Sequence, residues 1–258
     1  MVTQFSVDGQ TVIITGSSQG IGAVTAKRFA SDGANVVITS RSEDQIESVA
    51  AEINDSDRSG EAIAVECDVR DRAAVEALVE TTVEEFDRLD SMVNNAGVSF
   101  MSNFDDISEN GWKTIVDINL HGTFHCAQVA GRQMRTQADG GTIVNIASIA
   151  GTMGSEYMSH YGASKAAVIN LTASLAAAYA DHDIRVNCVA PGLVGTEGVA
   201  SQMGIDPADV ERGDVAKEMG RPEEIADIVQ FLASDASSYI AGETIVAQGV
   251  PPLEDSER

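Results

Sequence analysis

Short apolar runs alternate along the chain with longer stretches in which apolar residues recur every three or four positions. An apolar run of four to eight residues predicts a buried strand, and the longer period predicts a helix that buries one face. The predicted strands are residues 11–15, 34–39, 61–66, 90–94, 141–148, 183–190 and 243–248. Because helical patterns lie between consecutive strands, we predict a parallel sheet covered by helices on both faces, the doubly wound α/β class.

The whole chain is predicted to form one domain, residues 1–258. Its length and its 43% hydrophobic content suit one large core. No repeat or proline-rich linker interrupts the alternation, and the sequences SDG, DRSG and ADGG mark turns. The polar ending EDSER is expected to fray.

Targeting signals and cysteine patterns are also informative. No apolar stretch reaches eighteen residues, and the opening MVTQFSVDG lacks the regions of a signal peptide. We therefore expect a cytoplasmic protein that neither spans a membrane nor is exported. Cys67, Cys126 and Cys188 lie far apart without C-x-x-C spacing, which favours buried reduced thiols over a disulfide framework or a zinc site.

The charge of the chain is unusual, because 40 acidic residues face 16 basic ones and the net charge is -24. Such a chain repels nucleic acid and anionic lipid, so we expect neither as a partner. High charge alone would suggest disorder, but the apolar content and the periodic segments argue for a folded protein. Since charges are screened within about 3 Å at 1 M salt, we hypothesise a halophilic cytoplasm, which the scarcity of lysine also favours.

The most informative stretch is TGSSQGIG, residues 15–22, which follows the first predicted strand and precedes a helix expected to start near Gly20. Gly16, Gly20 and Gly22 allow a tight turn and the close approach of a pyrophosphate to the helix N-terminus. This predicts a dinucleotide site, although the same turn could pack a helix on a strand without a ligand.

The end of the second predicted strand indicates which dinucleotide is bound. An acid there would bind the adenosine ribose, but the sequence ITSRSED places Ser40 and Arg41 at that point. An arginine can bind a 2′-phosphate with two hydrogen bonds, which an acid would repel. We therefore predict a preference for NADP(H), with NAD(H) possible; Gln19, where a second base can stand, makes the preference modest.

The sequence YGASK carries the candidate chemistry. Tyr161 and Lys165 are four residues apart in a helical pattern, so their side chains leave the same face. The ammonium is expected to lower the phenol pKa from about 10 and to make Tyr161 a general acid and base. Ser148, at a strand end, supplies a hydroxyl for the same substrate oxygen. Tyr157 is a rival, but it has no lysine four residues later.

These residues also have plain structural interpretations. The tyrosine and the lysine could be a half-buried ring and a solvated charge, and Ser148 could cap a strand end. His121 and His125 have the spacing of a metal pair, yet no third ligand is apparent, and we predict no metal site. Trp112 and methionines such as those at 153, 158, 203 and 219 are expected to pack in the interior, or in part to line an apolar substrate wall.

The G-x-x-x-G-x-G spacing preceded by TG resembles the short-chain dehydrogenase/reductase family, in particular its 3-oxoacyl reductases. The resemblance covers nearly the whole chain through CDV, NNAG, INLHGTF, IVNIAS, YGASK, RVNCVAPG and GRPEEIADIVQFLAS. It implies a Rossmann fold, a nicotinamide cofactor, oxidoreductase activity and a homotetramer. The ending TIVAQGVPP departs from the family, in which an aspartate and paired glycines often follow the last strand.

The resemblance also implies a set of site residues. The catalytic residues would be Asn119, which holds a water linked to the lysine, with Ser148, Tyr161 and Lys165. The cofactor residues border the adenine in CDV, support the sheet and ribose in NNAG, and hold the nicotinamide end in PGLVGT. They are Gly16, Ser18, Gln19, Gly20, Ile21, Gly22, Ser40, Arg41, Asp68, Val69, Asn94, Asn95, Ala96, Gly97, Tyr161, Lys165, Pro191, Gly192, Val194 and Thr196.

The segment from about 196 to 219 corresponds to the substrate loop of the family. Its GTEG opening resembles 2,4-dienoyl-CoA reductases, but those lack the tyrosine of YGASK, so carbonyl and alcohol chemistry is favoured. The acids of the loop favour a small diffusible ketone, β-keto ester, acyl-CoA or sugar-like alcohol over an acyl chain bound to an acidic carrier protein. A sugar or polyol dehydrogenase, a dienoyl-CoA reductase and a non-catalytic dinucleotide-binding regulator remain alternatives.

Overall fold

The computed structural model describes residues 4–56, 60–204, 206, 209–210 and 219–250. It contains one seven-stranded parallel sheet in the order β3-β2-β1-β4-β5-β6-β7. The strands are β1 Thr11–Thr15, β2 Asn35–Thr39, β3 Ala62–Ala64, β4 Ser91–Asn94, β5 Gly141–Ile146, β6 Ile184–Pro191 and β7 Thr244–Ala247. This confirms the doubly wound α/β prediction.

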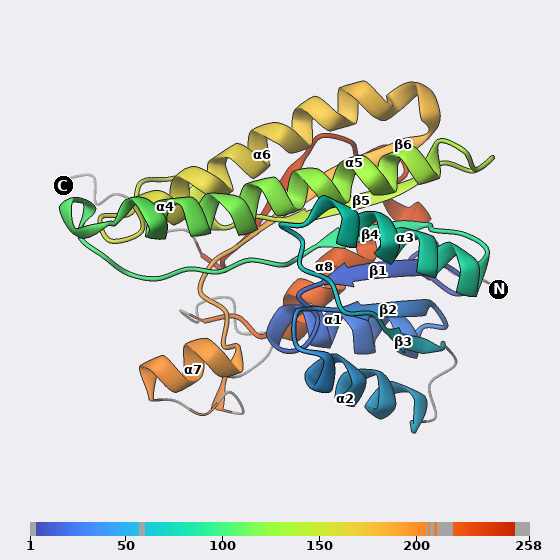
Figure 1. Cartoon of the computed structure of the whole chain (residues 1–258), viewed down its shortest axis with the longest axis horizontal. Helices are drawn as coiled ribbons and strands as arrows, with labels where there is room; N and C mark the ends of the chain where they lie inside the picture. The colour runs from blue at the N-terminus through green and yellow to red at the C-terminus, as the bar shows by residue number, and fades with distance from the viewer. Residues whose placement is uncertain (1–3, 57–59, 205, 207–208, 211–218, 251–258) are drawn as a thin grey trace.

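Helices cover both faces of the sheet (Figure 1). They are α1 Gly20–Ser31, α2 Glu43–Asn54, α3 Arg72–Phe86, α4 Glu109–Val116, α5 Gly122–Met134, α6 Ser159–Tyr179, α7 Glu197–Met203 and α8 Pro222–Ala233. A π-helical turn, Asp117–His121, joins α4 to α5, and short 3-10 turns include Phe104–Asp106, Ile149–Gly151, Ala180–His182 and Asp235–Ser237.

The alternation of side chains along each strand divides the core into two layers. In β1, Val12 and Ile14 pack with α1, α2 and α8, whereas Ile13 packs with α3, α5 and α6. Both sides of the strand are therefore apolar, which explains why the strand sequences are continuous apolar runs.

All the predicted strands agree with the structure to within two residues at each end, and the third is shortened the most. The prediction covered residues 61–66, whereas β3 contains only Ala62–Ala64. This strand pairs with β2 alone at the edge of the sheet, so fewer backbone hydrogen bonds extend it.

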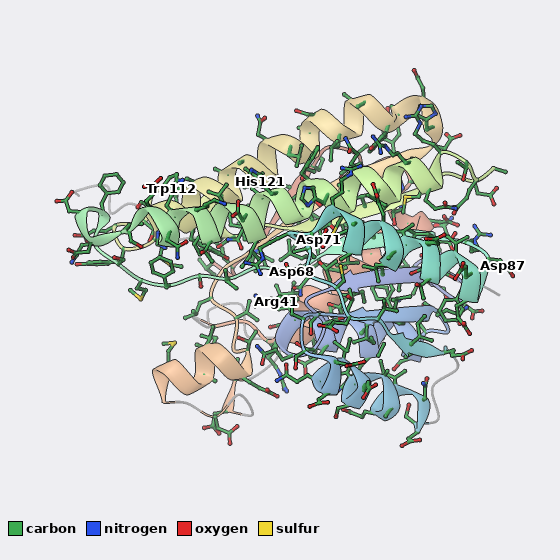
Figure 2. The ribbon with its side chains drawn as sticks, in the orientation of Figure 1. Arg41, Asp68, Asp71, Asp87, Trp112 and His121 are labelled. Atoms are coloured by element: carbon green, nitrogen blue, oxygen red, sulfur yellow. The ribbon has the colours of Figure 1, made fainter. Side chains whose placement is uncertain are left out.

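The prediction that the large side chains pack inside was partly wrong. Met219 is buried, but Trp112, Met153 and Met203 are exposed. Figure 2 shows Trp112 on α4, where this helix extends away from the sheet. Cys67, Cys126 and Cys188 are free and buried, as predicted. Of the helices in the described residues, none combines the length and apolar character needed to cross a bilayer.

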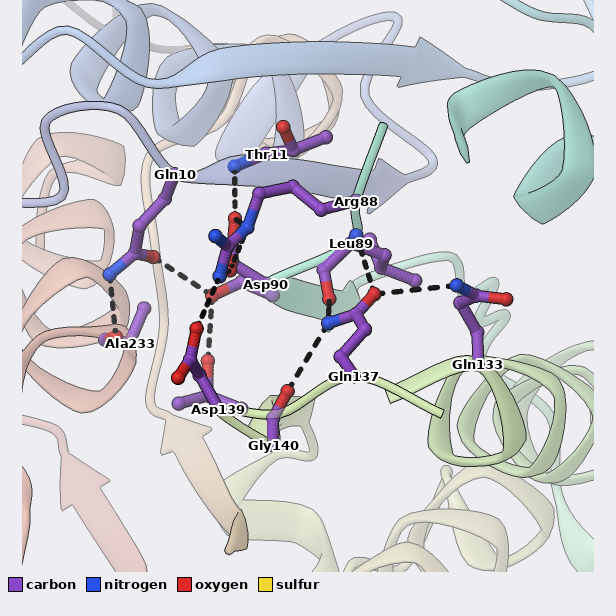
Figure 3. Close-up of polar contacts among 12 residues, drawn as sticks. Gln10, Thr11, Arg88, Leu89, Asp90, Gln133, Gln137, Asp139, Gly140 and Ala233 are labelled. Atoms are coloured by element: carbon purple, nitrogen blue, oxygen red, sulfur yellow. Dashed lines mark hydrogen bonds and ion pairs between the residues drawn. The ribbon is translucent and has the colours of Figure 1, made fainter. Parts of the chain in front are cut away.

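The amino ends of the central strands are joined by Asp90, which precedes β4 (Figure 3). Its carboxylate accepts a hydrogen bond of 2.8 Å from the Thr11 amide and further bonds from the Arg88 guanidinium. Its backbone carbonyl accepts a bond of 2.8 Å from the Thr142 amide. One residue thus connects the starts of β1, β4 and β5.

Between β1 and β4 the direction of the winding reverses. Successive strands run outward from β1 to β3, and the chain then returns to place β4 on the other side of β1. In open α/β sheets the helices on the two sides of this point diverge, and ligands bind beyond the carboxyl ends of the strands.

Candidate active site

The turn between β1 and α1 forms a cradle for an anionic group. Gly16 and Gly20 have φ values of 64° and 56°, in the left-handed region that favours glycine. A Cβ on Gly22 would lie 2.5 Å from the Gly16 carbonyl oxygen, so only glycine lets the helix start this close to the strand. Gln19 provides no side-chain cap, and the first turn of α1 carries no acid. The amides at this helix end are therefore available to phosphate, which fits a dinucleotide.

Asn95 holds this turn in place from the neighbouring strand. Its side-chain nitrogen donates to the carbonyl oxygens of Thr15 at 2.9 Å and Gly16 at 3.0 Å. The amides of Asn95 and Ala96 both donate to the Thr15 hydroxyl at 3.0 Å. The sequence predicted a cofactor role for Asn95 but missed Thr15, whose hydroxyl ties the two loops together.

A cleft of about 750 Å³ runs along the carboxyl ends of the strands. It brings together three of the four predicted catalytic residues, Ser148, Tyr161 and Lys165. The predicted cofactor residues that also line it are Gly16, Ser18, Gln19, Gly20, Ile21, Ser40, Arg41, Asp68, Val69, Asn95, Ala96, Gly97, Pro191, Gly192, Val194 and Thr196.

Three predicted residues do not line the cleft. Gly22 packs beneath the turn, where the Gly16 carbonyl leaves no room for a side chain. Asn94 is buried in the sheet, where its side-chain nitrogen donates to the Asn145 side-chain oxygen at 2.8 Å. Asn119 lies behind the loop that follows β4. These residues support the cleft from behind.

One end of the cleft is formed by the segments that follow β2 and β3. Arg41 and Asp68 lie close together there (Figure 2). Asp68 forms an ion pair with Arg70, a residue the sequence analysis did not single out, and the hydrogen bond from Arg70 lowers the Asp68 pKa. The charge of Arg41 lowers the same pKa to a smaller extent. Within the described part of the chain Arg41 itself takes part in no ion pair, so its guanidinium is free to bind a ligand.

The candidate chemical centre lies where β5 and α6 meet. Tyr161 and Lys165 are one turn apart on α6, and the Lys165 ammonium lies 5.7 Å from the centre of the Tyr161 ring. Ser148 follows β5 and accepts a hydrogen bond of 3.2 Å from the Ala150 amide. Its side chain also hydrogen-bonds Tyr161.

Burial shifts the pKa of both Tyr161 and Lys165. Lys165 is only 3% exposed and donates to the Ile146 carbonyl oxygen at 2.7 Å, and desolvation lowers its pKa to about 8. Desolvation raises the Tyr161 pKa, and the hydrogen bond with Ser148 lowers it by less. The prediction that the ammonium lowers the phenol pKa is therefore wrong for this structure, because burial of the ring dominates.

Asn119 lies in the π-helical turn and is fully buried. Its side-chain oxygen accepts from the Val98 amide at 2.9 Å, and its nitrogen donates to the Val98 carbonyl at 3.0 Å and to the Ser164 hydroxyl at 3.1 Å. The side chain thus joins the loop after β4 to α6. Ser164 was not identified from sequence, although it lies between Tyr161 and Lys165 in YGASK.

The two histidines at helical spacing do not converge. His121 lies 3.0 Å from the Asp117 carboxylate, and His125 lies 3.0 Å from the Val69 carbonyl oxygen. No group of three potential metal ligands occurs among the described residues.

The predicted substrate loop is described only in part. Its first residues form α7, capped by the Thr196 hydroxyl, which accepts from the Val199 amide at 3.4 Å. The Thr196 methyl group would lie 3.3 Å from a Cβ on Gly20, so the loop begins against the cradle. Residues 205, 207–208 and 211–218 lie outside the described residues.

A family model described as enoyl-(acyl carrier protein) reductase matches residues 16–249, which is most of the chain. The chain is 37% identical to a short-chain type dehydrogenase/reductase from Mycobacterium marinum of known structure, with a TM-score of 0.87 and coverage of 95% of this chain and 96% of the other. The chain belongs to the short-chain dehydrogenase/reductase family. It is an oxidoreductase of this NAD(P)-binding family.

Two sequence relatives illustrate the range of activities within the short-chain dehydrogenase/reductase family. A 3-oxoacyl-[acyl-carrier-protein] reductase from Synechocystis is 35% identical over 246 residues, 95% of this chain and 97% of the relative. A probable 2,4-dienoyl-CoA reductase from Bacillus subtilis is 34% identical over 247 residues, 94% of this chain and 96% of the relative. Their similar identities do not distinguish the two chemistries, so the choice depends on the site.

Proposed function

We propose that the protein is an NADP(H)-preferring reductase that interconverts a carbonyl compound and a secondary alcohol. The observation that carries this proposal is that Ser148, Tyr161 and Lys165 line the same cleft as the glycine cradle. Burying an ammonium group lowers the stability of the folded protein. A protein that only binds a dinucleotide would have no functional reason to keep such a group in its cleft.

The proposed reaction uses these side chains for binding and proton transfer. The nicotinamide, when bound, supplies or accepts the hydride. Ser148 donates a hydrogen bond to the substrate carbonyl oxygen, and Tyr161 delivers its hydroxyl proton to that oxygen as negative charge develops there. A raised Tyr161 pKa keeps this proton in place at neutral pH, which suits the reductive direction.

Lys165 has two tasks in this proposal. Its ammonium stabilises the phenolate that remains after Tyr161 has given up its proton. Its lowered pKa, about 8, also lets it exchange protons with solvent near neutral pH, so that Tyr161 can be reprotonated. Asn119 acts through the packing of α6 against the loop after β4, and the water it would hold is still implied only by the family resemblance.

The preference for NADP(H) rests on Arg41. This side chain lines the cleft beside Asp68, has no ion-pair partner among the described residues, and follows β2, where an acid would select NAD(H). NAD(H) remains a possible second cofactor because, among the described residues that line this end of the cleft, Arg41 is the one cation.

The experiment compares kcat/KM for NADPH and NADH with a panel of ketones, by nicotinamide absorbance in molar KCl. Arg41→Asp is expected to shift the ratio toward NADH by at least about tenfold, since it replaces attraction by repulsion. Arg135→Asp, at an exposed site that caps the C-terminus of α5 outside the cleft, makes the same change in net charge and controls for it. A wild-type preference for NADH would refute the cofactor assignment.

The panel also tests the alternative functions. Oxidation of sugars or polyols as the sole activity would make the protein a polyol dehydrogenase, and reduction of a dienoyl-CoA would make it a dienoyl reductase. Cofactor binding without any turnover would support a regulator. Tyr161, in hydrogen-bond contact with Ser148, favours carbonyl chemistry over both dienoyl reduction and regulation.

We also propose a homotetramer in a salt-rich cytoplasm. Exposed aromatic side chains on α4 and α5, including Trp112 and Phe124, support association through that layer, and closed symmetric assembly is common. The net charge of -24 supports a salt requirement. Light scattering that gives a single 27.1 kDa chain in high salt would contradict the tetramer.

A further inference from the structure

The part of the cleft beyond the chemical centre has an apolar wall. It consists of side chains from the segment between Ser148 and Tyr161, from the loop after β4, and from the approach to α7 and the first turn of that helix. They are Val98, Met153, Met158, Leu193 and Val199. We refer to these five residues as the methionine wall.

Charged groups are few among the described residues that line the cleft. Among the described lining residues they are Arg41, Asp68, Lys165 and Glu197. Arg41 and Asp68 lie together at the end next to β2 and β3, and the buried Lys165 ammonium is bonded to the Ile146 carbonyl. The charged side chain that remains near the methionine wall is Glu197, an exposed acid in the first turn of α7.

An anionic substrate would therefore meet no described cation beside the methionine wall. Moving a carboxylate or phosphate out of water without a partner is costly, and Glu197 adds repulsion. The net charge of -24 acts in the same direction at low salt. In strong salt long-range repulsion is screened, but the described residues of the wall still offer an anion no cationic partner.

An apolar ligand, by contrast, would gain from the same wall. Met153 and Leu193 are 53% and 42% exposed, an unusual state for large apolar side chains that line a cavity. Covering such surface is favourable by about 25 cal/mol per Å². The flexible thioethers of Met153 and Met158 can adapt to rings of different shape.

We propose that the substrate is an uncharged, compact, apolar ketone or its alcohol, with an aromatic or alicyclic ring held by the methionine wall, and that Glu197 disfavours anions. This inference rests on the proposed carbonyl chemistry. It narrows the substrate class by excluding keto acids and compounds with a phosphate next to the reacting carbonyl.

The test uses two ketones with the same acetylphenyl skeleton, methyl 4-acetylbenzoate, which is neutral, and 4-acetylbenzoate, which lacks the ester methyl group and carries a negative charge. Each is titrated by calorimetry into the protein loaded with NADP⁺, an oxidised cofactor that cannot reduce a ketone, so binding is measured without turnover. The ester is expected to bind roughly tenfold more tightly, as expected for one unpaired charge. Rates with NADPH are then measured for both compounds.

Variants locate the selectivity. Met153→Lys places a cation on the methionine wall. It is expected to reduce the ratio of the two affinities, ester over carboxylate, by about threefold, which is the usual effect of one exposed charge pair. Met203→Lys is the matched control, because Met203 is 54% exposed on α7 but does not line the cleft. Glu197→Gln is expected to improve binding of the carboxylate and to leave the ester unchanged.

The outcomes separate this inference from the proposed function. Equal affinity for both ketones, no binding of either, or equal effects of the two lysine variants would overturn the substrate class. Tight, selective binding of the ester without reduction by NADPH or NADH would uphold the inference on the ligand and overturn the proposed reaction.

Discussion

The amino and carboxyl ends of the strands use polar residues in opposite ways. At the amino ends, Asp90 bonds to Thr11 and Arg88, and the hydroxyls of Ser91 and Thr142 lie 2.6 Å apart (Figure 3). Gln137 closes this network by bonding to the amide and the carbonyl of Leu89. Here each polar side chain has partners within the protein, and the result is a rigid edge.

At the carboxyl ends of the strands, several polar groups lack hydrogen-bond partners or have lost hydration. The α1 N-terminus has no side-chain cap, and Lys165 has given up hydration for a carbonyl bond. The buried oxygens of Thr39 and Asn94 have no hydrogen-bond partner among the described residues. The two edges of the sheet therefore differ in function. The amino edge stabilises the fold, whereas the carboxyl edge carries groups that lower stability and are available to bind a ligand.

The largest effect that could break this comparison concerns Tyr161. Tyr161→Phe is expected to reduce kcat by about 10²- to 10⁴-fold with cofactor affinity nearly unchanged, because the proton donor is lost while the ring remains. Stopped-flow kinetics and cofactor titration would measure both quantities.

Tyr179→Phe is the matched control, since Tyr179 is a buried tyrosine on the same helix but belongs to the core layer with α3 and α5. It is expected to keep its activity. Retention of more than about a tenth of wild-type turnover by Tyr161→Phe would rule out this tyrosine as the essential proton carrier.

The second test asks whether Lys165 costs stability. Its pKa is about 8 in the folded protein, below the ordinary 10.5, so the unfolded state binds the proton more strongly. The cost is complete below pH 8 and is relieved as the pH rises to about 10.5.

Without cofactor, the stability of Lys165→Met relative to wild type is expected to fall by about 3 kcal/mol between pH 7 and pH 10.5. Urea unfolding at both pH values in molar KCl measures this difference, with Lys113→Met at an exposed site as the control. A difference that does not change with pH would show that burial of Lys165 carries no such cost.

The smallest effect concerns the amino edge. Asp90→Asn keeps the shape of the side chain but removes the charge that binds Arg88, and it is expected to cost about 1–3 kcal/mol of stability. Its kinetic constants should stay within about twofold of wild type, because the substitution lies at the far end of the strands.

Asp68→Asn provides the opposite case at the carboxyl edge. Asp68 is partly exposed, so its loss should change stability little, while binding of the adenosine part of the cofactor weakens. If both variants altered stability and cofactor binding alike, the division of work between the edges would be wrong.

Sequence predicted most strands and the lining of the cleft because both depend on short patterns. The apolar runs and the glycine turn act within a few residues, and the family motifs identified Ser148, Tyr161 and Lys165. Predictions that depended on tertiary surroundings were less reliable. The Tyr161 pKa is raised because packing dehydrates the ring, and Trp112 is exposed because α4 extends away from the sheet.

Residues that support others were the hardest to recognise. Val98 binds Asn119 through its backbone amide and carbonyl. Because every residue except proline has both of these groups, the sequence at position 98 does not reveal the contact. The π-helical turn that places Asn119 is likewise invisible in a pattern of apolar residues, because the register change spans only Asp117–His121.

That turn also bears on which changes in chain length the protein can accept. A π-helical turn holds one residue more than the equivalent α-helical turn. Deleting one residue from Asp117–His121 could restore a continuous helix with its backbone bonds intact, yet it would rotate α5 by about 100° relative to α4. The buried face of α5 and the Asn119 amide could then no longer both face inward. A deletion that makes the helix more regular would thus break the connection that Asn119 forms between α6 and the loop after β4. The additional residue of the π-helical turn is therefore needed for the geometry of the site.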